Sequence, residues 1–463
     1  MLRRYIGDKD FYRQVFAIAI PIILQNAITN FVAMLDNVMV GQLSTAQIGG
    51  VTISNNNLLF IFNICLFGGA AGAGIFTTQF KGSNNYEGVR YTVRFKMLIC
   101  VLLTVIATGV FLLWPDPLIG LYLQGDGDPQ LAADTLRYGR EYLFVMLWGL
   151  LPFAITNAYA GTLRECGHPT VPMVAGLVAT GTNLVLNYLL IFGKLGFPAL
   201  GVQGAAIATV ISRYVEMGIV IAWTHLHPQQ CPYAPGLFRS LYIPQKLLGS
   251  IITKGMPLLV NELFWTVGMA MINQCYSTCG LNVVPAMSIS STIYNLTSVI
   301  YRSLGNTIGI ITGQMLGAGH GREKLLDANR KLLAMGAAFG VVFGAVTAVF
   351  SGVFPQIYNT SDEVRLLASR LILISAILMP LEAYSFPVYF TLRAGGKTMI
   401  TTLFDCGSIW ILHLPVAFCL SRWTDISVLV IFALCKATDL VKCIVGRALI
   451  RSGFWIQNLA DDT

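Results

Sequence analysis

Charged residues are scarce in this chain of 463 residues. Asp, Glu, Lys and Arg make up 11% of it, against about a quarter in a typical soluble domain. Hydrophobic residues make up 55%. This balance excludes an ordinary soluble protein and predicts a polytopic membrane protein. The formal net charge of +8 is therefore interpreted by position along the chain and not as a sign of nucleic-acid binding.

Motifs for energy-coupled or covalent chemistry are also missing. The ten cysteines contain no CxxC pair and no secreted disulfide framework, so they are expected to pack as small apolar residues. The Gly-rich run GGAAGAG at 68–74 has no lysine at P-loop spacing and predicts close helix packing. Without a nucleotide, metal or nucleophile motif, we expect neither an enzyme nor a cofactor. A transporter with this sequence would draw its energy from an ion gradient.

Apolar stretches long enough to cross a bilayer recur along the whole chain, separated by Gly, Pro and charge. We therefore expect an all-α integral membrane protein. The predicted spans are 15–40, 51–79, 97–114, 138–160, 171–192, 203–224, 255–279, 285–315, 333–354, 366–390, 400–420 and 426–448.

Basic residues gather before the first span and after the even-numbered spans. They are Arg3, Arg4, Lys9, Arg13, Lys81, Arg90, Arg94, Lys96, Arg164, Arg239, Lys246, Lys254, Arg322, Lys324, Arg330, Lys331, Arg393, Lys397, Arg447 and Arg451. The other side carries few bases and several acids, namely Asp116, Asp126, Asp128, Asp134, Asp362 and Glu363. By the positive-inside rule, both termini and the loop at 225–250 are expected in the cytoplasm.

The Pro-rich loop divides the chain into two sets of six spans, 1–224 and 251–463, with 225–250 as a linker. Four short segments recur in the same order in both sets. AIPIILQN, ISNN, TQFKG and TLRECGHPT begin at residues 19, 53, 78 and 162, and GMPLLVNE, ISST, GQMLG and TLRAGGKT begin at residues 255, 289, 313 and 391. This order predicts a duplication into parallel repeats, related by a pseudo-two-fold axis along the membrane normal.

Three acids within the spans, Asp36, Glu262 and Glu382, have no base nearby in sequence. An isolated charge at membrane depth costs at least ~2.5–3.5 kcal/mol, so such acids are candidates for binding a cation or a proton. The alternative is that they only accept hydrogen bonds from neighbouring helices. Pro21 and Pro257 precede the first two acids and are expected to bend their helices.

Other polar residues within the spans have two interpretations. Asn183 and Asn187 lie four apart on one helix face, which suits either a cation site shared with Asp36 or a helix–helix hydrogen bond. Lys436, Asp439 and Lys442 are spaced by three and are expected to pair along their own helix. Asp405 is expected to pair with Lys397 or Arg393.

Several segments together resemble multidrug and toxic compound extrusion (MATE) transporters of the bacterial type, over nearly the full length. The first span with LDNVMVGQLS at 35–44 is similar to the family's first-helix signature. TLRECGHPTVPM at 162–173 and NLVLNYLLIFGKLGFPALGVQGAAIAT at 183–209 resemble its fifth- and sixth-helix signature, and TLRAGGKT repeats that motif. The resemblance implies twelve helices in two pseudo-two-fold-related six-helix bundles around a central cleft.

The resemblance also implies a function. A family member would be a monomeric antiporter of the inner membrane that exports organic cations or drugs in exchange for Na⁺ or H⁺. Asp36 would bind the proton or cation, Na⁺ included, with help from Asn183 and Asn187. Glu262 and Glu382 would be the acidic pair of the C-terminal bundle. The chain departs from some relatives at Asn187, where they have an acid.

Two other functions stay open. A flippase for a lipid-linked precursor, in a related superfamily, would be expected to line its cleft with bases, whereas the unpaired candidates in this sequence are mostly acids. A membrane receptor or scaffold could keep a transporter fold without transporting anything.

Overall fold

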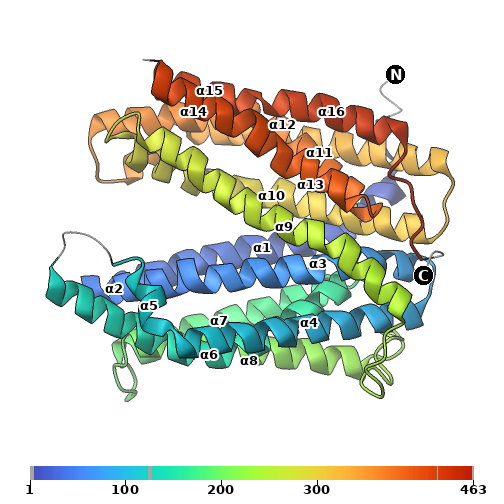
Figure 1. The fold of residues 1–463 in the computed structure, drawn as a ribbon, viewed down its shortest axis with the longest axis horizontal. Coiled ribbons are helices and arrows are strands. Elements are labelled where there is room, and N and C mark those ends of the chain that lie inside the picture. Colours follow the sequence, from blue (N-terminus) through green and yellow to red (C-terminus); the bar gives the residue numbers. More distant parts are fainter. Residues whose placement is uncertain (1–4, 124–127, 425, 461–463) are drawn as a thin grey trace. The chain divides into compact units, whose positions relative to one another are not determined.

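A computed structural model of the chain describes residues 5–123, 128–424 and 426–460, which form helices joined by turns and loops (Figure 1). Arg3, Arg4 and Asp126, which entered the prediction of orientation, lie outside these ranges. The α-helices are α1 (Lys9–Val40), α2 (Thr45–Thr52), α3 (Phe60–Gly82), α4 (Tyr86–Leu113), α5 (Pro115–Gly120), α6 (Pro129–Glu165), α7 (Thr170–Phe192), α8 (Val202–Leu226), α9 (Gln245–Ser277), α10 (Val283–Gly317), α11 (Arg322–Phe350), α12 (Asp362–Ala394), α13 (Thr398–Ser408), α14 (Leu414–Trp423), α15 (Val428–Ala437) and α16 (Asp439–Ser452). Wider π-helical turns, Ile53–Leu59 and Ile409–His413, join α2 to α3 and α13 to α14.

Within the described ranges, 11 helical stretches are long and apolar enough to cross a membrane. They coincide with the first eleven predicted spans. The predicted twelfth span is occupied by α15 and α16, which are separated at Thr438, so neither piece alone reaches spanning length. Helix α1 continues through Pro21 and α9 continues through Pro257, so these two prolines do not end their helices.

Large apolar side chains remain exposed along the membrane-spanning helices. On α4, Val105 is 63% exposed and Leu113 is 70% exposed, and on α11 Val349 is 75% exposed. Such a surface would be unfavourable in water, whereas lipid tails cover it without cost. The exposed apolar faces therefore agree with the membrane location that the composition predicts.

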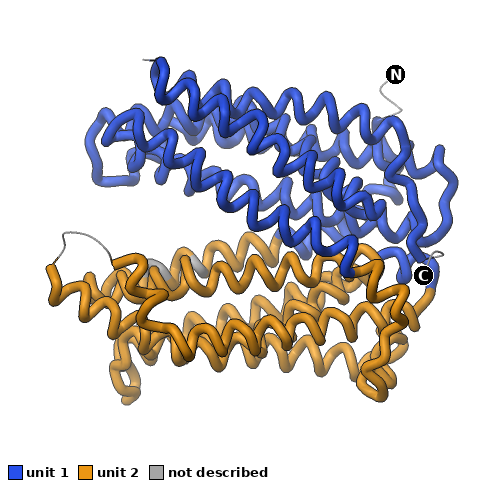
Figure 2. Tube along the Cα trace, viewed as in Figure 1, with its two compact units in different colours: residues 1–23, 78–84, 252–463 blue, residues 24–77, 85–251 orange. Residues whose placement is uncertain are grey.

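The chain forms two compact units, coloured separately in Figure 2. Unit 1 comprises residues 1–23, 78–84 and 252–463, and unit 2 comprises residues 24–77 and 85–251. The boundaries fall inside α1, α3 and α9, so each of these helices contributes residues to both units. In α1 the boundary follows Pro21 by two residues.

Glycine allows close helix packing inside each unit, as the small residues of membrane helices usually do. In unit 2, a Cβ on Gly204 of α8 would lie 2.6 Å from the Leu190 carbonyl oxygen of α7. In unit 1, a Cβ on Gly340 of α11 would lie 2.8 Å from the Cα of Pro380 in α12. In the Gly-rich run, Gly69 packs against α4, with 3.3 Å between its Cβ position and Ile99.

The repeated motifs TQFKG and GQMLG contact each other within unit 1. A Cβ on Gly82 would overlap the Gln314 carbonyl group, and a Cβ on Gly317 would overlap the Gln79 carbonyl group. The contact is reciprocal, since the glycine of each motif meets the glutamine of the other. Reciprocal contacts of this kind arise where two equivalent segments meet at a two-fold axis. The Gln79 side chain adds hydrogen bonds to the Ala394 carbonyl oxygen at 2.8 Å and the Leu459 amide at 2.6 Å.

The loop between α8 and α9 is held against unit 2 by two arginines of α4. Arg90 donates to the Tyr233 carbonyl oxygen at 3.2 Å. Arg94 donates to the carbonyl oxygens of Leu237 at 2.8 Å and Tyr242 at 3.0 Å. Tyr233 is 1% exposed, and its burial raises the pKa of its hydroxyl above the ordinary value. Thus two bases that indicate orientation in the sequence also order this loop.

The reciprocal glycine contact yields the first prediction. Replacing Gly317 with Ala adds a methyl group where the Gln79 carbonyl group lies, and such overpacking typically costs about 1–3 kcal/mol. We expect a lower thermal unfolding midpoint in detergent for Gly317→Ala, measured by tryptophan fluorescence.

Gly218→Ala in α8 is the matched control, because no atom lies within 4 Å of its Cβ position. The control should unfold at the wild-type temperature or slightly above it. Equal midpoints for the two variants would show that the reciprocal contact does not constrain the fold.

Candidate functional site

A cavity of about 480 Å³ lies inside unit 1, between α9, α10, α12, α13, α15 and α16. Aromatic and apolar side chains form much of its wall, including Trp265, Tyr276, Phe386 and Phe432. Its charged and titratable lining residues are Glu262, Arg302, Glu382, Arg393, Asp405, His413, Lys436, Asp439 and Lys442. The cavity therefore combines apolar walls with acids and bases in equal number, leaving His413 aside.

Glu382 of α12 receives donors on both carboxylate oxygens. Lys436 of α15 forms an ion pair and hydrogen bond with Oε1. The hydroxyl groups of Tyr294 and Tyr301, on α10, donate to Oε2 at 2.5 Å and 2.8 Å. The Lys436 ammonium also lies 4.6 Å from the centre of the Tyr294 ring. This buried carboxylate is thus fully bound by donors from two other helices.

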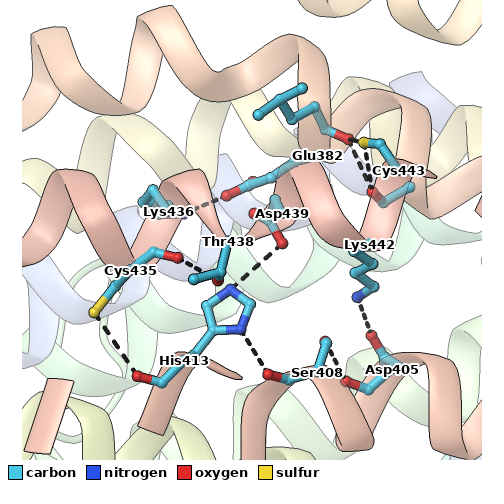
Figure 3. Close-up of polar contacts among 12 residues, drawn as sticks. Glu382, Asp405, Ser408, His413, Cys435, Lys436, Thr438, Asp439, Lys442 and Cys443 are labelled. Carbon is cyan, nitrogen blue, oxygen red and sulfur yellow. Dashed lines mark hydrogen bonds and ion pairs between the residues drawn. The ribbon is translucent and has the colours of Figure 1, made fainter. Parts of the chain in front are cut away.

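Two further side-chain contacts connect α16 to the segments facing it, an ion pair at Lys442 and a histidine–carboxylate contact at Asp439. Lys442 Nζ lies 2.7 Å from Asp405 Oδ1 on α13, and the Asn261 amide of α9 donates to Asp405 Oδ2 at 3.2 Å. His413 Nε2 lies 3.4 Å from Asp439 Oδ1, while His413 Nδ1 contacts the Ser408 carbonyl oxygen at 3.0 Å. Figure 3 shows the Lys436, Asp439 and Lys442 side chains, each directed to a different partner.

These contacts correct three expectations. Lys436, Asp439 and Lys442 do not pair along their own helix, because each reaches a different facing segment. Asp405 pairs with Lys442 and not with Lys397 or Arg393. Glu382 does have a base beside it, which comes from a segment 54 positions away in sequence. The interruption at Thr438 separates Lys436 on α15 from the other two on α16.

Glu262 of α9 lines the same cavity but forms no ion pair within 4 Å among the described residues. Arg302 of α10 lies over the Phe386 ring, 5.4 Å from its centre, and its buried Nε has no hydrogen-bond partner among the described residues. Four bases thus line this cavity beside its four acids.

Asp36 belongs to unit 2, where amide groups of α7 surround its carboxylate. Asn187 Nδ2 donates to Asp36 Oδ1 at 2.7 Å. With its amide turned by 180°, Asn183 donates to the two Asp36 oxygens at 2.9 Å and 3.1 Å, and its oxygen accepts from Thr209. We adopt this orientation, because the other one places an amide oxygen against a carboxylate. A helix–helix hydrogen bond thus joins α1 and α7.

Neutral amides orient the Asp36 carboxylate without cancelling its charge. No Lys or Arg within the described ranges forms an ion pair with Asp36. The Oδ1 atom of Asn187 is buried and lacks a hydrogen-bond partner among the described residues. Carboxylate and amide oxygens are both ligands that hard cations prefer.

The structure thus brings the predicted site residues together as two groups, one in each unit. Asp36, Asn183 and Asn187 share unit 2, whereas Glu262 and Glu382 share the cavity in unit 1. No cluster of three His, Cys, Asp or Glu side chains arranged to hold a metal ion occurs among the described residues.

The partners of Glu382, which are Lys436, Tyr294 and Tyr301, were not predicted from the sequence. One signal could have found Lys436. Three charged residues on one face of a membrane-spanning segment must face protein rather than lipid, so they need partners on other helices. Nothing in the sequence distinguishes the two tyrosines from the many other aromatic residues.

Comparisons with known proteins identify the fold and the family. A family profile described as MatE matches residues 21–189 and 257–419. The probable multidrug resistance protein NorM of Thermotoga maritima is 24% identical over 420 residues, which cover 91% of this chain and 88% of that protein. The multidrug resistance protein NorM of Aliivibrio fischeri is 25% identical over 434 residues, covering 90% and 88%.

Solved structures share the fold. MATE in complex with MaL6 superposes with a TM-score of 0.84 at 19% identity, covering 97% of this chain and 98% of that chain. An outward-facing multidrug resistance MATE family transporter of the MOP superfamily gives a TM-score of 0.83 at 19% identity and the same coverage. The predicted fold class and the resemblance are both confirmed.

The buried pair at Glu382 yields the second prediction. Removing one partner of a buried ion pair typically costs about 3–5 kcal/mol, because the other charge is left uncompensated. We expect Lys436→Met to lower the thermal unfolding midpoint strongly. The double variant Lys436→Met, Glu382→Gln should recover much of that loss, as measured by a double-mutant cycle in detergent.

Lys194→Met is the matched control, since Lys194 is exposed and belongs to no ion pair within 4 Å among the described residues. It should unfold near the wild-type temperature. Additive effects of the two substitutions at Lys436 and Glu382 would contradict a direct coupling between these side chains.

Proposed function

The chain belongs to the MatE family of membrane transporters, and on this basis we propose that it is a secondary active antiporter. It exports organic cations, drugs among them, in exchange for Na⁺ or H⁺. The names of the relatives support multidrug substrates, since several are multidrug resistance proteins. Membership in a transporter family, rather than an enzyme family, also agrees with the lack of catalytic motifs.

One observation supports ion coupling more than any other, namely the environment of Asp36. Its carboxylate lies in a membrane-spanning helix and is held by the amide groups of Asn183 and Asn187. Amide donors leave its negative charge in place, and an uncompensated charge at membrane depth is costly. A proton or a Na⁺ ion that binds at Asp36 removes this cost.

Coupling then follows from the free energy of the occupied and empty states. Loading Asp36 favours the conformation in which its carboxylate is best enclosed, and unloading favours the other conformation. The ion gradient therefore sets the direction of the conformational change. An organic cation bound in the unloaded state is carried outward, because substrate and coupling ion alternate.

We assign the acidic pair Glu262 and Glu382 to the cavity of the C-terminal bundle. Glu262 lines the cavity without an ion pair among the described residues, so it is open to a mobile cation. Glu382 already has the Lys436 ammonium as its counter-charge. The two acids therefore have different roles in the cycle.

The remaining assignments concern organisation and location. We propose an N-terminal bundle at 1–224, a linker at 225–250 and a C-terminal bundle at 251–463. Both termini are placed in the cytoplasm, because basic residues concentrate on that side. The protein is a multi-pass membrane protein, and we propose that it functions as a monomer in the inner membrane, with Pro21 and Pro257 as bending points.

The third prediction tests the role of Asp36. The variant Asp36→Asn keeps the hydrogen-bonding shape of the side chain but cannot bind or release a cation as a carboxylate does. We expect efflux of a fluorescent organic cation from proteoliposomes to fall to the rate of protein-free vesicles when an ion gradient is applied.

Asp134→Asn is the control, because Asp134 lies on an exposed surface and, among the described residues, forms an ion pair only with Arg137 at 3.6 Å. It should transport at the wild-type rate. Collapsing the Na⁺ and H⁺ gradients separately identifies the coupling ion. Wild-type efflux by folded Asp36→Asn protein would contradict the assignment, and failure of all proteins to move any cation would favour a receptor or scaffold.

A further inference from the structure

The groups around the Lys436 ammonium resemble those that surround a bound monovalent cation. The ammonium takes the position beside Glu382 that such a cation would occupy. Lys436 contacts Oε1, and the oxygens of Tyr294 and Tyr301 lie 2.5 Å and 2.8 Å from Oε2. Aromatic rings complete the environment, since the ammonium lies 4.6 Å from the Tyr294 ring centre and 6.0 Å from that of Phe432. Such rings attract cations through their negative faces.

The position of Lys436 is fixed by its helix. α15 packs on α12 through buried apolar residues, including Phe432 and Cys435 on the lysine side. The Lys436 and Glu382 side chains are only 22% and 11% exposed. The ammonium is therefore tethered beside the carboxylate and cannot diffuse away as a free ion would.

We infer that Lys436 is a built-in counter-cation that occupies the cation position at Glu382 and so excludes Na⁺ from it. Lys436 is then a specificity-determining residue, because exchangeable cations can bind only at acidic side chains that have no basic side chain beside them. This inference rests on the proposed function only for the choice of Na⁺ as the cation class. It concerns binding at Glu382 and is independent of whether Asp36 drives efflux.

Removal of the lysine side chain should uncover a site for a metal cation. The space left by Lys436→Ala adjoins Glu382 Oε1 and the Tyr294 ring, and the hydroxyl groups of Tyr294 and Tyr301 lie on the other carboxylate oxygen, Oε2. A phenol hydroxyl both donates and accepts, so each tyrosine can turn a lone pair toward a cation. Carboxylate and hydroxyl oxygens are suitable ligands for a hard cation such as Na⁺.

The test measures Na⁺ binding through thermal stability of the full-length protein in detergent. All variants carry Asp36→Asn and Glu262→Gln, which remove the two other acids proposed to bind a cation. The midpoint is recorded at increasing NaCl, with N-methylglucamine chloride at equal ionic strength as the reference. A ligand that binds only the folded state raises the midpoint in a concentration-dependent manner.

We expect no Na⁺-specific rise for the Asp36→Asn, Glu262→Gln protein and a rise of several degrees after Lys436→Ala is added. Adding Glu382→Gln to that triple variant should abolish the rise. Lys194→Ala, on an exposed loop, is the control lysine and should produce no Na⁺ response. Lys436→Ser, which leaves a similar space with an added hydroxyl, replaces Lys436→Ala if the latter does not fold.

Two results would overturn the inference. One is a Na⁺-specific rise in the Asp36→Asn, Glu262→Gln protein with Lys436 intact, because Na⁺ would then bind without removal of the lysine. The other is a folded Lys436→Ala or Lys436→Ser protein without any Na⁺ response. Neither result bears on efflux by the wild type, so failure of this inference is separable from failure of the proposed function.

Discussion

The cost of leaving a charge uncompensated in a low-dielectric interior governs the polar part of this structure. In unit 1, Glu382 and Asp405 are each neutralised by a lysine from α15 or α16. In unit 2, amide groups bind the Asp36 carboxylate, which forms no ion pair with a described residue. The same physical rule thus produces structural ion pairs in one place and a candidate for ion exchange in the other.

Charged side chains also connect the last helical segment to the rest of unit 1. α15 and α16 are separated only at Thr438, whose backbone angles are helical. Their charged residues connect them to α12, to α13 and to the π-helical turn before α14. These contacts add to the apolar packing of α15 on α12 and give the cavity its balanced charge.

Much of the fold could be predicted from the sequence, because the lengths of the apolar stretches and the positions of the basic residues can be read locally along the chain. The repeated motifs TQFKG and GQMLG even mark a contact, since Gly82 and Gly317 pack on each other's motif. Asp36 and its asparagines could be grouped from the four-residue spacing of Asn183 and Asn187. The partner of Glu382 could not be predicted in this way. An ion pair between helices depends on how the helices pack, and the spacing of residues within one helix does not encode that packing.

The most direct measurement is chemical modification of the buried carboxyl groups by a hydrophobic carbodiimide, mapped by mass spectrometry. Such reagents react with protonated carboxyl groups that are not held by a base. We expect the reagent to modify Asp36 but not Glu382 in the wild type. Glu382 should become reactive when Lys436 is replaced by Ala. Modification of Glu382 in the wild type as fast as that of Asp36 would contradict this expectation.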